Sequence, residues 1–233
     1  NAACDALRDA EGWRPNVDTY DADLPLFVHV HRGHCRLYRV LSGAGSMHRR
    51  SYRADMPMHT AALKETVAAA MLLHAGYDGT ATLCDPMCGS GSLAIEAALI
   101  ATRCAPGLLR PPPALTRWPD AELRDAWSDA CDEARALRLP RAVAPILAND
   151  KHGGAIDLAR RAADAAGVAA DIHFSRSEVS SYRPVQTPEL VVSNPPWGGR
   201  LQDAEPAWAD MGDFLRRECS HADAWLLSGN REL

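Results

Sequence analysis

Hydrophobic and polar residues follow two different patterns along the chain. Near the N-terminus, a short helical pattern at residues 2–12 precedes two alternating stretches, 26–31 and 35–41, which flank Arg32-Gly33-His34 and predict a β-hairpin. From His59 onward, apolar-periodic helices alternate with short apolar strands. The expected helices are 61–74, 92–104, 153–166 and 206–219, and the expected strands are 80–84, 143–148, 170–174, 189–193 and 223–228. This alternation predicts an α/β fold with a parallel sheet and right-handed crossovers.

Prolines mark the boundaries in this pattern. Pro57 separates the N-terminal part from the alternating region, so we expect one unit at 1–56 and a second at 57–233. Residues 105–141 contain six prolines and predict an irregular insertion with one helix at about 120–137.

Composition narrows the class of protein. The 233 residues are 47% hydrophobic and 24% charged, which is typical of a globular protein. The sequence contains neither a long apolar run that could cross a membrane nor a leader peptide, so we expect no membrane partner. Seven scattered cysteines indicate reduced thiols, and we therefore expect a soluble intracellular protein, in the cytoplasm or in an organelle.

Charge is distributed unevenly. The net charge is −5, yet residues 25–54 contain six arginines and no acid. Such a segment is typical of a surface that contacts a phosphate backbone, and Tyr38 and Tyr52 within it could stack on unpaired bases. We expect Arg49, Arg50 and Arg53 to bind RNA; the alternative is a solvated strand face. His29 and His31 share one strand face, but a third metal ligand at a suitable spacing is missing from the sequence, so we expect no metal.

The first chemical motif is Asp85-Pro86-Met-Cys88-Gly89-Ser90-Gly91, between a predicted strand and a predicted helix. The glycines allow the backbone to turn and approach a ligand, and the start of the helix offers free N–H groups. The pattern also matches a dinucleotide fingerprint, which requires an acid about 20 residues later. The acid at the next strand end is Asp150, much further along the chain, and Asp85 suits a ligand with an ammonium group. These features favour S-adenosylmethionine over NAD.

The second motif is Asn194-Pro195-Pro196-Trp197, which follows the apolar strand at 189–193. The side-chain carbonyl of Asn194 and the backbone carbonyl of Pro195 could accept both hydrogens of a planar exocyclic amine. Trp197 offers a flat surface for a base that has been extruded from its stack. The alternative, a Pro-Pro turn that closes a strand, does not explain the Asn and the Trp.

Together these motifs resemble motifs I and IV of class I S-adenosylmethionine-dependent amino-methyltransferases. The segment Met47–Arg53, followed by residues 63–69, resembles the connection between a THUMP RNA-binding domain and its methylase. Residues 105–110 with Trp118-Pro119 are similar to the insertion of bacterial-type 23S rRNA guanine-N2-methyltransferases and their plant relatives. The resemblance implies a Rossmann-like sheet with strand order 3-2-1-4-5, without strands 6 and 7, after part of a THUMP-like α+β unit.

The resemblance also implies roles for individual residues. Asn194, Pro195, Pro196 and Trp197 would hold the target guanine, and His59, Thr60 and Lys64 would lie near the methionine end of the cofactor. The expected cofactor-binding residues are Asp85, Pro86, Cys88, Gly89, Ser90, Gly91, Asp150, Lys151, Ser177, Glu178 and Asn194. Asp150 would bind the ribose hydroxyls. Ser177 occupies the place where the family has an Asp that receives the adenine amine, so either Glu178 replaces that Asp or the cofactor binds more weakly.

The resulting expectation is S-adenosylmethionine-dependent methylation of a guanosine N2 amine, with large-subunit rRNA as the partner. Three alternatives stay open: methylation of adenine N6, methylation of a tRNA guanosine, and an inactive RNA-binding factor in ribosome assembly. Cys84 and Cys88 could indicate covalent pyrimidine methylation, but their place in the first motif favours packing. His152 could contact the cofactor or simply lie on the surface at the start of a helix.

Overall fold

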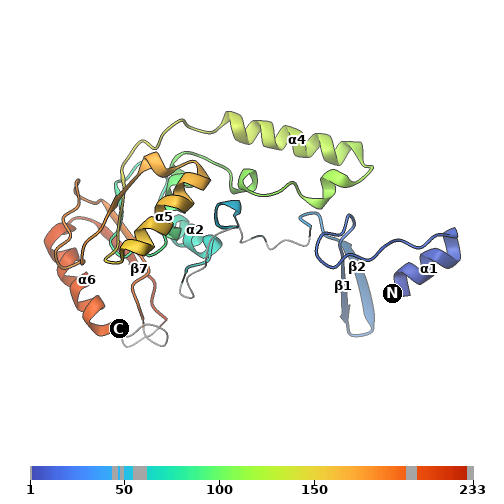
Figure 1. Cartoon of the computed structure of the whole chain (residues 1–233), viewed down its shortest axis with the longest axis horizontal. Helices are drawn as coiled ribbons and strands as arrows, with labels where there is room; N and C mark the ends of the chain where they lie inside the picture. The colour runs from blue at the N-terminus through green and yellow to red at the C-terminus, as the bar shows by residue number, and fades with distance from the viewer. Residues whose placement is uncertain (1, 44–46, 48–49, 55–61, 198–203, 230–233) are drawn as a thin grey trace. The chain divides into compact units, whose positions relative to one another are not determined.

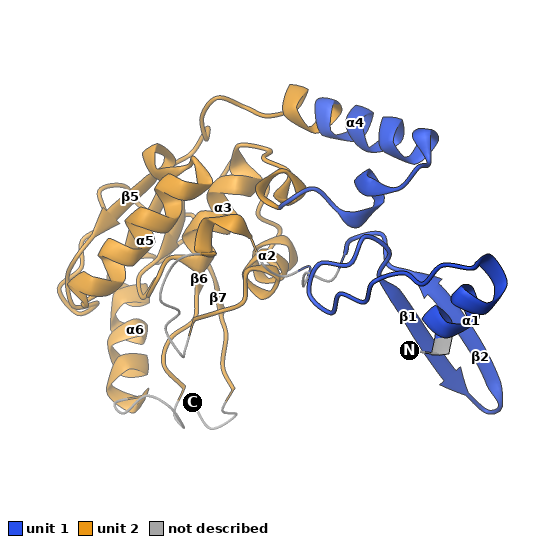
Figure 2. Ribbon diagram, turned by 45° about the vertical axis from the view of Figure 1, so that its right-hand side comes forward, with its two compact units in different colours: residues 1–47, 111–132 blue, residues 48–110, 133–233 orange. Residues whose placement is uncertain are grey.

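The computed structural model describes residues 2–43, 47, 50–54, 62–197 and 204–229. The described chain forms two compact units (Figure 2): residues 1–47 with 111–132, and residues 48–110 with 133–233. We call them unit 1 and unit 2.

Unit 1 contains an isolated hairpin. Helix α1 (Ala2–Glu11) precedes strands β1 (Leu26–His31) and β2 (His34–Arg39), which pair antiparallel with His31 opposite His34. The expected hairpin is therefore present, but His34 belongs to the second strand and not to the turn. Arg32 and Gly33 form the two-residue turn with φ of 47° and 75°, as the type of hairpin with two left-handed residues requires. Every residue of both strands is exposed.

Part of the expected insertion belongs to unit 1. Helix α4 (Ala121–Ala136) lies in the expected insertion, and its residues up to 132 belong to the same compact unit as the N-terminal residues. Arg117 forms an ion pair with Asp21 at 3.0 Å, and the indole N–H of Trp118 donates to the Asp23 carbonyl at 2.6 Å. Arg39 lies over the Trp118 ring, 4.9 Å from its centroid. These contacts join segments about 80 to 96 residues apart in the sequence, which local sequence patterns do not reveal.

Unit 2 contains a parallel sheet in the order β5-β4-β3-β6-β7. This order is 3-2-1-4-5 when the five strands are counted within the unit, so the predicted fold class and strand order are confirmed. The strands are β3 (Leu83–Asp85), β4 (Ile146–Asn149), β5 (Ile172–Ser175), β6 (Leu190–Ser193) and β7 (Asp223–Leu226). The helices are α2 (Glu65–His74), α3 (Ser92–Ala101), α5 (Gly153–Ala166) and α6 (Ala204–Glu218), with short 3-10 turns that include η1 (Ser51–Arg53). Figure 1 labels the edge strand β7 and the helices α2, α5 and α6 of this unit.

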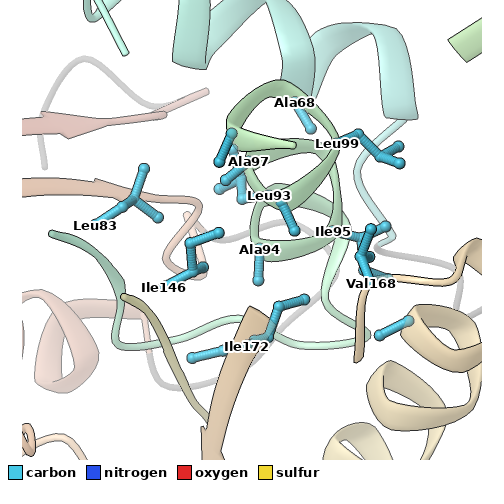
Figure 3. Packing of buried hydrophobic residues seen from close by; sticks show 14 of the residues in the cluster. Ala68, Leu83, Leu93, Ala94, Ile95, Ala97, Leu99, Ile146, Val168 and Ile172 are labelled. Atoms are coloured by element: carbon cyan, nitrogen blue, oxygen red, sulfur yellow. The ribbon is translucent and has the colours of Figure 1, made fainter. Parts of the chain in front are cut away.

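Successive side chains along each strand point to opposite faces of the sheet. Leu83, Ile146 and Ile172 pack in one core with α3, whereas Cys84 and Leu147 pack in a second core with Phe214 of α6. Figure 3 shows Ala94, Ile95 and Ala97 of α3 among the residues of the first core. Nine of the ten residues of α3 are buried, so this helix is a central element of unit 2.

Most helix and strand bounds agree with the sequence to within a few residues. The largest difference is at α2, which was expected from residue 61 but begins at Glu65 in the structure. Lys64 has an extended backbone before the helix, with ψ of 140°, and residue 61 lies outside the described residues. All seven cysteines are free thiols, as expected.

Candidate active site at the carboxyl edge of the sheet

The two chemical motifs meet at one edge of the sheet. β3 pairs in parallel with both β4 and β6, so the carboxyl ends of these three strands lie side by side. In open α/β sheets, ligands bind outside this edge, at the point where the strand order reverses. Here the reversal lies between β3 and β6, which carry the two motifs.

Asp85 and Ser193 connect the motifs directly. Asp85, the last residue of β3, is buried, and its Oδ1 accepts a hydrogen bond of 2.6 Å from the hydroxyl of Ser193 at the end of β6. The Met87 N–H donates to the same oxygen at 3.3 Å. Burial raises the pKa of Asp85 to about 7, and the nearby charge of Asp150 acts in the same direction. The site therefore contains a buried carboxyl that a cationic ligand group would stabilise as carboxylate.

The glycine loop, residues 86–91, joins β3 to α3 with a backbone conformation that requires glycine at two positions. Gly89 and Gly91 have φ of 53° and 82°, in the left-handed region. A Cβ on Gly91 would lie 2.8 Å from the Cβ of Ala159 in α5. Gly91 precedes the first turn of α3, and no capping side chain takes up the N–H groups there. The loop therefore packs closely on α5 and enters α3 without a side-chain cap from Gly91.

Asp150 contacts the glycine loop from the next strand. Its Oδ2 accepts from the Gly89 N–H at 2.9 Å, and its Oδ1 accepts from the His152 N–H at 2.8 Å. The Asp150 carboxylate therefore links the carboxyl ends of β3 and β4. A second link is the hydrogen bond of 2.8 Å from the Cys88 N–H to the Asn149 carbonyl. Each Asp150 oxygen retains a second lone pair with which it can bind a hydroxyl.

Asn149 is a site residue that the sequence analysis missed. Its side chain is fully buried, and its amide donates to the carbonyls of Pro86 (3.1 Å) and Ser177 (3.0 Å). It thereby ties the loop after β3 to the loop after β5. The signal in the sequence was a polar residue at the end of an apolar strand, immediately before Asp150.

Ser177 and Glu178 lie beside this tie. The Ser177 hydroxyl donates to Asn149 Oδ1 at 3.0 Å, so its role in the structure is to hold the loop. Glu178 is exposed and pairs with Lys151 at 3.9 Å. Of the two residues, only Glu178 presents a carboxylate to solvent at this position.

The loop 194–197 after β6 is fixed by two tryptophans. The Trp197 indole N–H donates to Asn194 Oδ1 at 3.0 Å, and the Trp208 indole N–H, from α6, donates to the Pro196 carbonyl at 2.8 Å. Trp197 is 42% exposed, and one edge of its ring packs so closely on Gly229 that a Cβ there would overlap it. Trp208 and Gly229 were not expected from the sequence, because they reach the loop from α6 and from the segment after β7.

Cys84 and Cys88 are both buried. Burial raises the pKa of each thiol well above its usual value, and the neighbouring Asp85 acts in the same direction. Both thiols therefore remain protonated near neutral pH, which agrees with packing and not with covalent catalysis.

The arginines expected to bind RNA have other contacts. Arg50 is 7% exposed and pairs with the buried Glu96 of α3 at 3.5 Å. Arg53 is partly buried and donates to the Ser90 carbonyl in the glycine loop at 3.1 Å. In this arrangement both side chains contact the protein, and Arg50 has no surface to offer a phosphate. Arg49, His59 and Thr60 lie outside the described residues.

The remaining candidates are on exposed surfaces. Lys64 is exposed, while the carbonyl of the adjacent Leu63 accepts from the Ser92 hydroxyl at 2.9 Å, which places the start of α2 at the start of α3. His152 is exposed at the start of α5.

The ring centroids of His29 and His31 are 6.1 Å apart and the rings are stacked. Among the described residues there is no group of three or more His, Cys, Asp or Glu side chains that could hold a metal ion. The described helices include none with the length and apolarity of a membrane span.

Comparison with protein families gives two matches. Residues 50–231 match the RMKL-like methyltransferase domain, and residues 1–40 match the THUMP domain.

Curated relatives include ribosomal RNA large subunit methyltransferase K/L of Syntrophotalea carbinolica, 37% identical over 100% of this chain and 34% of the relative. The protein of the same name in Methylococcus capsulatus is 38% identical over 100% of this chain and 32% of its own length. The chain thus spans about a third of the length of these relatives.

Solved structures agree on the fold. A predicted N6-adenine-specific DNA methylase from Listeria monocytogenes is 30% identical, with a TM-score of 0.82, over 99% of this chain and 60% of the other. A methyltransferase crystallised with S-adenosylhomocysteine has a TM-score of 0.81 at 23% identity, over 99% of this chain and 60% of the other. At that level of identity, the second structure supports the fold alone.

Proposed function

The chain belongs to the family of RMKL-like methyltransferase domains, and from this premise we propose that it methylates the exocyclic N2 amine of a guanosine in large-subunit rRNA, with S-adenosylmethionine as methyl donor. The observation that carries the proposal is the bond between Asp85 and Ser193, which places the glycine loop and the Asn-Pro-Pro-Trp loop side by side. The names of the relatives at 37–38% identity support rRNA as the substrate.

The residues at the edge of the sheet fit the cofactor. Gly91 packs so closely on Ala159 of α5 that a Cβ would not fit, and the first turn of α3 has no side-chain cap from Gly91, so its N–H groups can face an incoming ligand. Asp85 would face the ammonium group of the methionine end, where its buried carboxyl gains most from a cationic partner. Asp150 would bind the ribose hydroxyls, and Glu178 would receive the adenine amine in place of the usual Asp. When bound, S-adenosylmethionine supplies a methyl group that its sulfonium already activates.

The loop 194–197 fits a flat base. Asn194 Oδ1 is oriented by the Trp197 N–H and keeps a second lone pair, and among the described residues no group donates to the Pro195 carbonyl. Both oxygens could thus accept hydrogens from one amine, while the ring of Trp197 stacks on the base. The Trp208 bond to the Pro196 carbonyl holds the loop in position.

These contacts account for the chemistry of a weak nucleophile. The lone pair of a guanine amine is delocalised into the ring, and two carbonyl acceptors favour a more tetrahedral nitrogen and stabilise the positive charge that develops on it. Positioning of two reactants can lower a barrier by about 7–11 kcal/mol, so the proposal needs no strong general base. The proton on the amine leaves to water after transfer.

The test is Asn194→Ala in the full-length protein. Loss of one positioned acceptor should lower kcat about 100-fold or more, whereas the control Asn16→Ala, in an exposed part of unit 1, should leave kcat unchanged. Calorimetric titration with S-adenosylhomocysteine shows whether the variant still forms the cofactor site. Methylation near the wild-type rate would contradict the role of Asn194 as an amine acceptor.

Methylation of adenine N6 is the second candidate, favoured by the likeness to the Listeria structure and by the same four-residue motif. An adenine amine presents the same two hydrogens to Asn194 and Pro195, so this geometry does not separate the two bases. The identity of the methylated nucleoside distinguishes methylation of guanine N2 from methylation of adenine N6.

A further inference from the structure

The segment 50–54, which we call the linker turn, is embedded in unit 2. Tyr52 is 2% exposed, and its hydroxyl donates to the buried Glu96 of α3 at 2.9 Å. Arg50 pairs with the same carboxylate at 3.5 Å, and η1 packs against α5. The backbone of the linker turn is thus anchored on the two helices that follow the cofactor-binding strands β3 and β4.

Arg53 extends from this anchored turn to the glycine loop. Its Nη2 lies 3.1 Å from the Ser90 carbonyl and 3.4 Å from the Ser90 hydroxyl. The guanidinium carbon also lies 5.7 Å from the centroid of the Tyr52 ring, which restricts the orientation of the side chain. The contact therefore joins a fixed cation to the residue between Gly89 and Gly91.

Ser90 lies between two glycines whose backbone is costly to fix. Gly89 and Gly91 both have left-handed φ, and glycine loses more conformational freedom than any other residue when it is fixed. A hydrogen bond from a charged donor is stronger than one between neutral groups. Arg53 can therefore add a restraint on the loop between the two glycines, beside the bond from the Gly89 N–H to Asp150.

We propose that Arg53 is a positioning residue of the cofactor site, which holds the glycine loop through the Ser90 carbonyl and is itself held by the Tyr52–Glu96 bond. The proposal rests on the proposed function, because the loop is taken to bind the cofactor. It assigns to Arg53 a role in the methyltransferase domain in place of the RNA contact expected from the sequence.

The experiment measures the affinity of the full-length protein for S-adenosylhomocysteine by calorimetry. Arg53→Ala should weaken binding about tenfold or more, since a hydrogen bond to a charged group is lost, and Arg53→Lys should recover part of the loss. The matched control is Arg138→Ala, which also removes an Nη2 bond to a backbone carbonyl, that of Gly167 at 3.3 Å, at the far end of α5. The control should bind S-adenosylhomocysteine as the wild type does.

Hydrogen exchange provides a readout that does not depend on activity. Amide exchange in residues 89–91 should become faster in Arg53→Ala, while exchange in the strands and the melting temperature stay close to wild type. If the alanine variant does not fold, the comparison of Arg53→Lys with the wild type replaces it.

The outcomes separate the two proposals. A wild type that fails to bind S-adenosylhomocysteine contradicts the proposed function. A wild type that binds, together with Arg53 variants that bind equally well, overturns the role of Arg53. Unchanged cofactor affinity with weaker binding to a fragment of large-subunit rRNA overturns it also, and returns Arg53 to the RNA-binding surface.

Discussion

The hairpin of unit 1 and the sheet of unit 2 place the residues of their short strands in opposite environments. All residues of β3, β4 and β6 are buried, whereas every residue of β1 and β2 is exposed. Val30 is 69% exposed and Ile146 is 0% exposed, although both are β-branched residues within a strand. The difference shows that β-propensity alone says little about stability, since burial decides what a strand residue contributes.

Different interactions stabilise each of the two units internally. The two continuous apolar cores of the described chain contain residues of unit 2 only. Unit 1 is tied by Arg117 to Asp21, by Trp118 to the Asp23 carbonyl and by Arg39 over the Trp118 ring. Exposed ion pairs contribute up to about 1 kcal/mol each. We therefore expect large effects of substitution in unit 2 and small ones in the hairpin.

The largest expected effect on stability is that of Ile146→Ala. The side chain is fully buried in the core that also contains Leu83 and residues of α3, and its truncation leaves a cavity in this larger core. The free energy of unfolding should fall by about 3 kcal/mol, as measured by urea denaturation of the chain followed by circular dichroism. A loss below about 1 kcal/mol would remove the contrast between the two units.

Asp85→Asn tests the polar edge of the same sheet. The pKa of Asp85 is raised to about 7 from an ordinary 3.8, so between these pH values the folded state retains a proton that the unfolded state releases. Stability from this group therefore falls as the pH rises from about 4 to 7. The neutral variant should lack this fall and be more stable than the wild type by a few kcal/mol at pH 8, with little difference at pH 4.

The measurement is urea denaturation of both proteins across this pH range. S-adenosylhomocysteine affinity should rise with pH through about 7 in the wild type and be weak at every pH in the variant, because the proposed ammonium partner is lost. Parallel stability curves for the two proteins would show that Asp85 titrates at its ordinary value.

Trp208→Phe tests whether the loop 194–197 needs support from α6. The substitution keeps an aromatic ring but removes the N–H that binds the Pro196 carbonyl. We expect kcat to fall about tenfold, equivalent to about 1.4 kcal/mol, with unchanged affinity for S-adenosylhomocysteine. Trp13→Phe, at a tryptophan that is 59% exposed in unit 1, is the matched control. Equal kcat for the two variants would contradict the supporting role.

The smallest expected effect is that of Val30→Ala in the hairpin. Because the side chain is mostly exposed, the free energy of unfolding should change by no more than about 0.5 kcal/mol. The same urea titration as for Ile146→Ala checks this value. A loss as large as that of Ile146→Ala would mean that a partner surface covers the hairpin in solution.

Sequence patterns predicted the helices and strands of unit 2 and their order along the chain. The strands are continuous apolar runs, and α5 is bounded by Gly153 and Gly167. The glycine loop and the loop 194–197 were found for the same reason, since each depends on residues that are adjacent in the chain. The resemblance to a known family supplied the strand order, which the structure confirms.

Long-range contacts escaped the sequence analysis. Trp208 bonds to the Pro196 carbonyl from the next helix. Asn149, at the end of β4, bonds to the Ser177 carbonyl, which follows the neighbouring strand β5. Arg50 was read as part of a basic surface, but its partner Glu96 lies on α3, 46 residues away in the printed sequence. Charge counted along a segment does not show which side chains turn inward, so a buried arginine and a phosphate-binding one have the same sequence pattern.

The most direct test of the central claim identifies the product. The full-length protein is incubated with isotopically methyl-labelled S-adenosylmethionine and unmodified large-subunit rRNA, and the RNA is digested to nucleosides for mass spectrometry. Methylation of guanosine N2 predicts label in N2-methylguanosine, formed about 100-fold or more slowly when Asn194→Ala replaces the wild type. Label in N6-methyladenosine, or no labelled nucleoside at all, would contradict it.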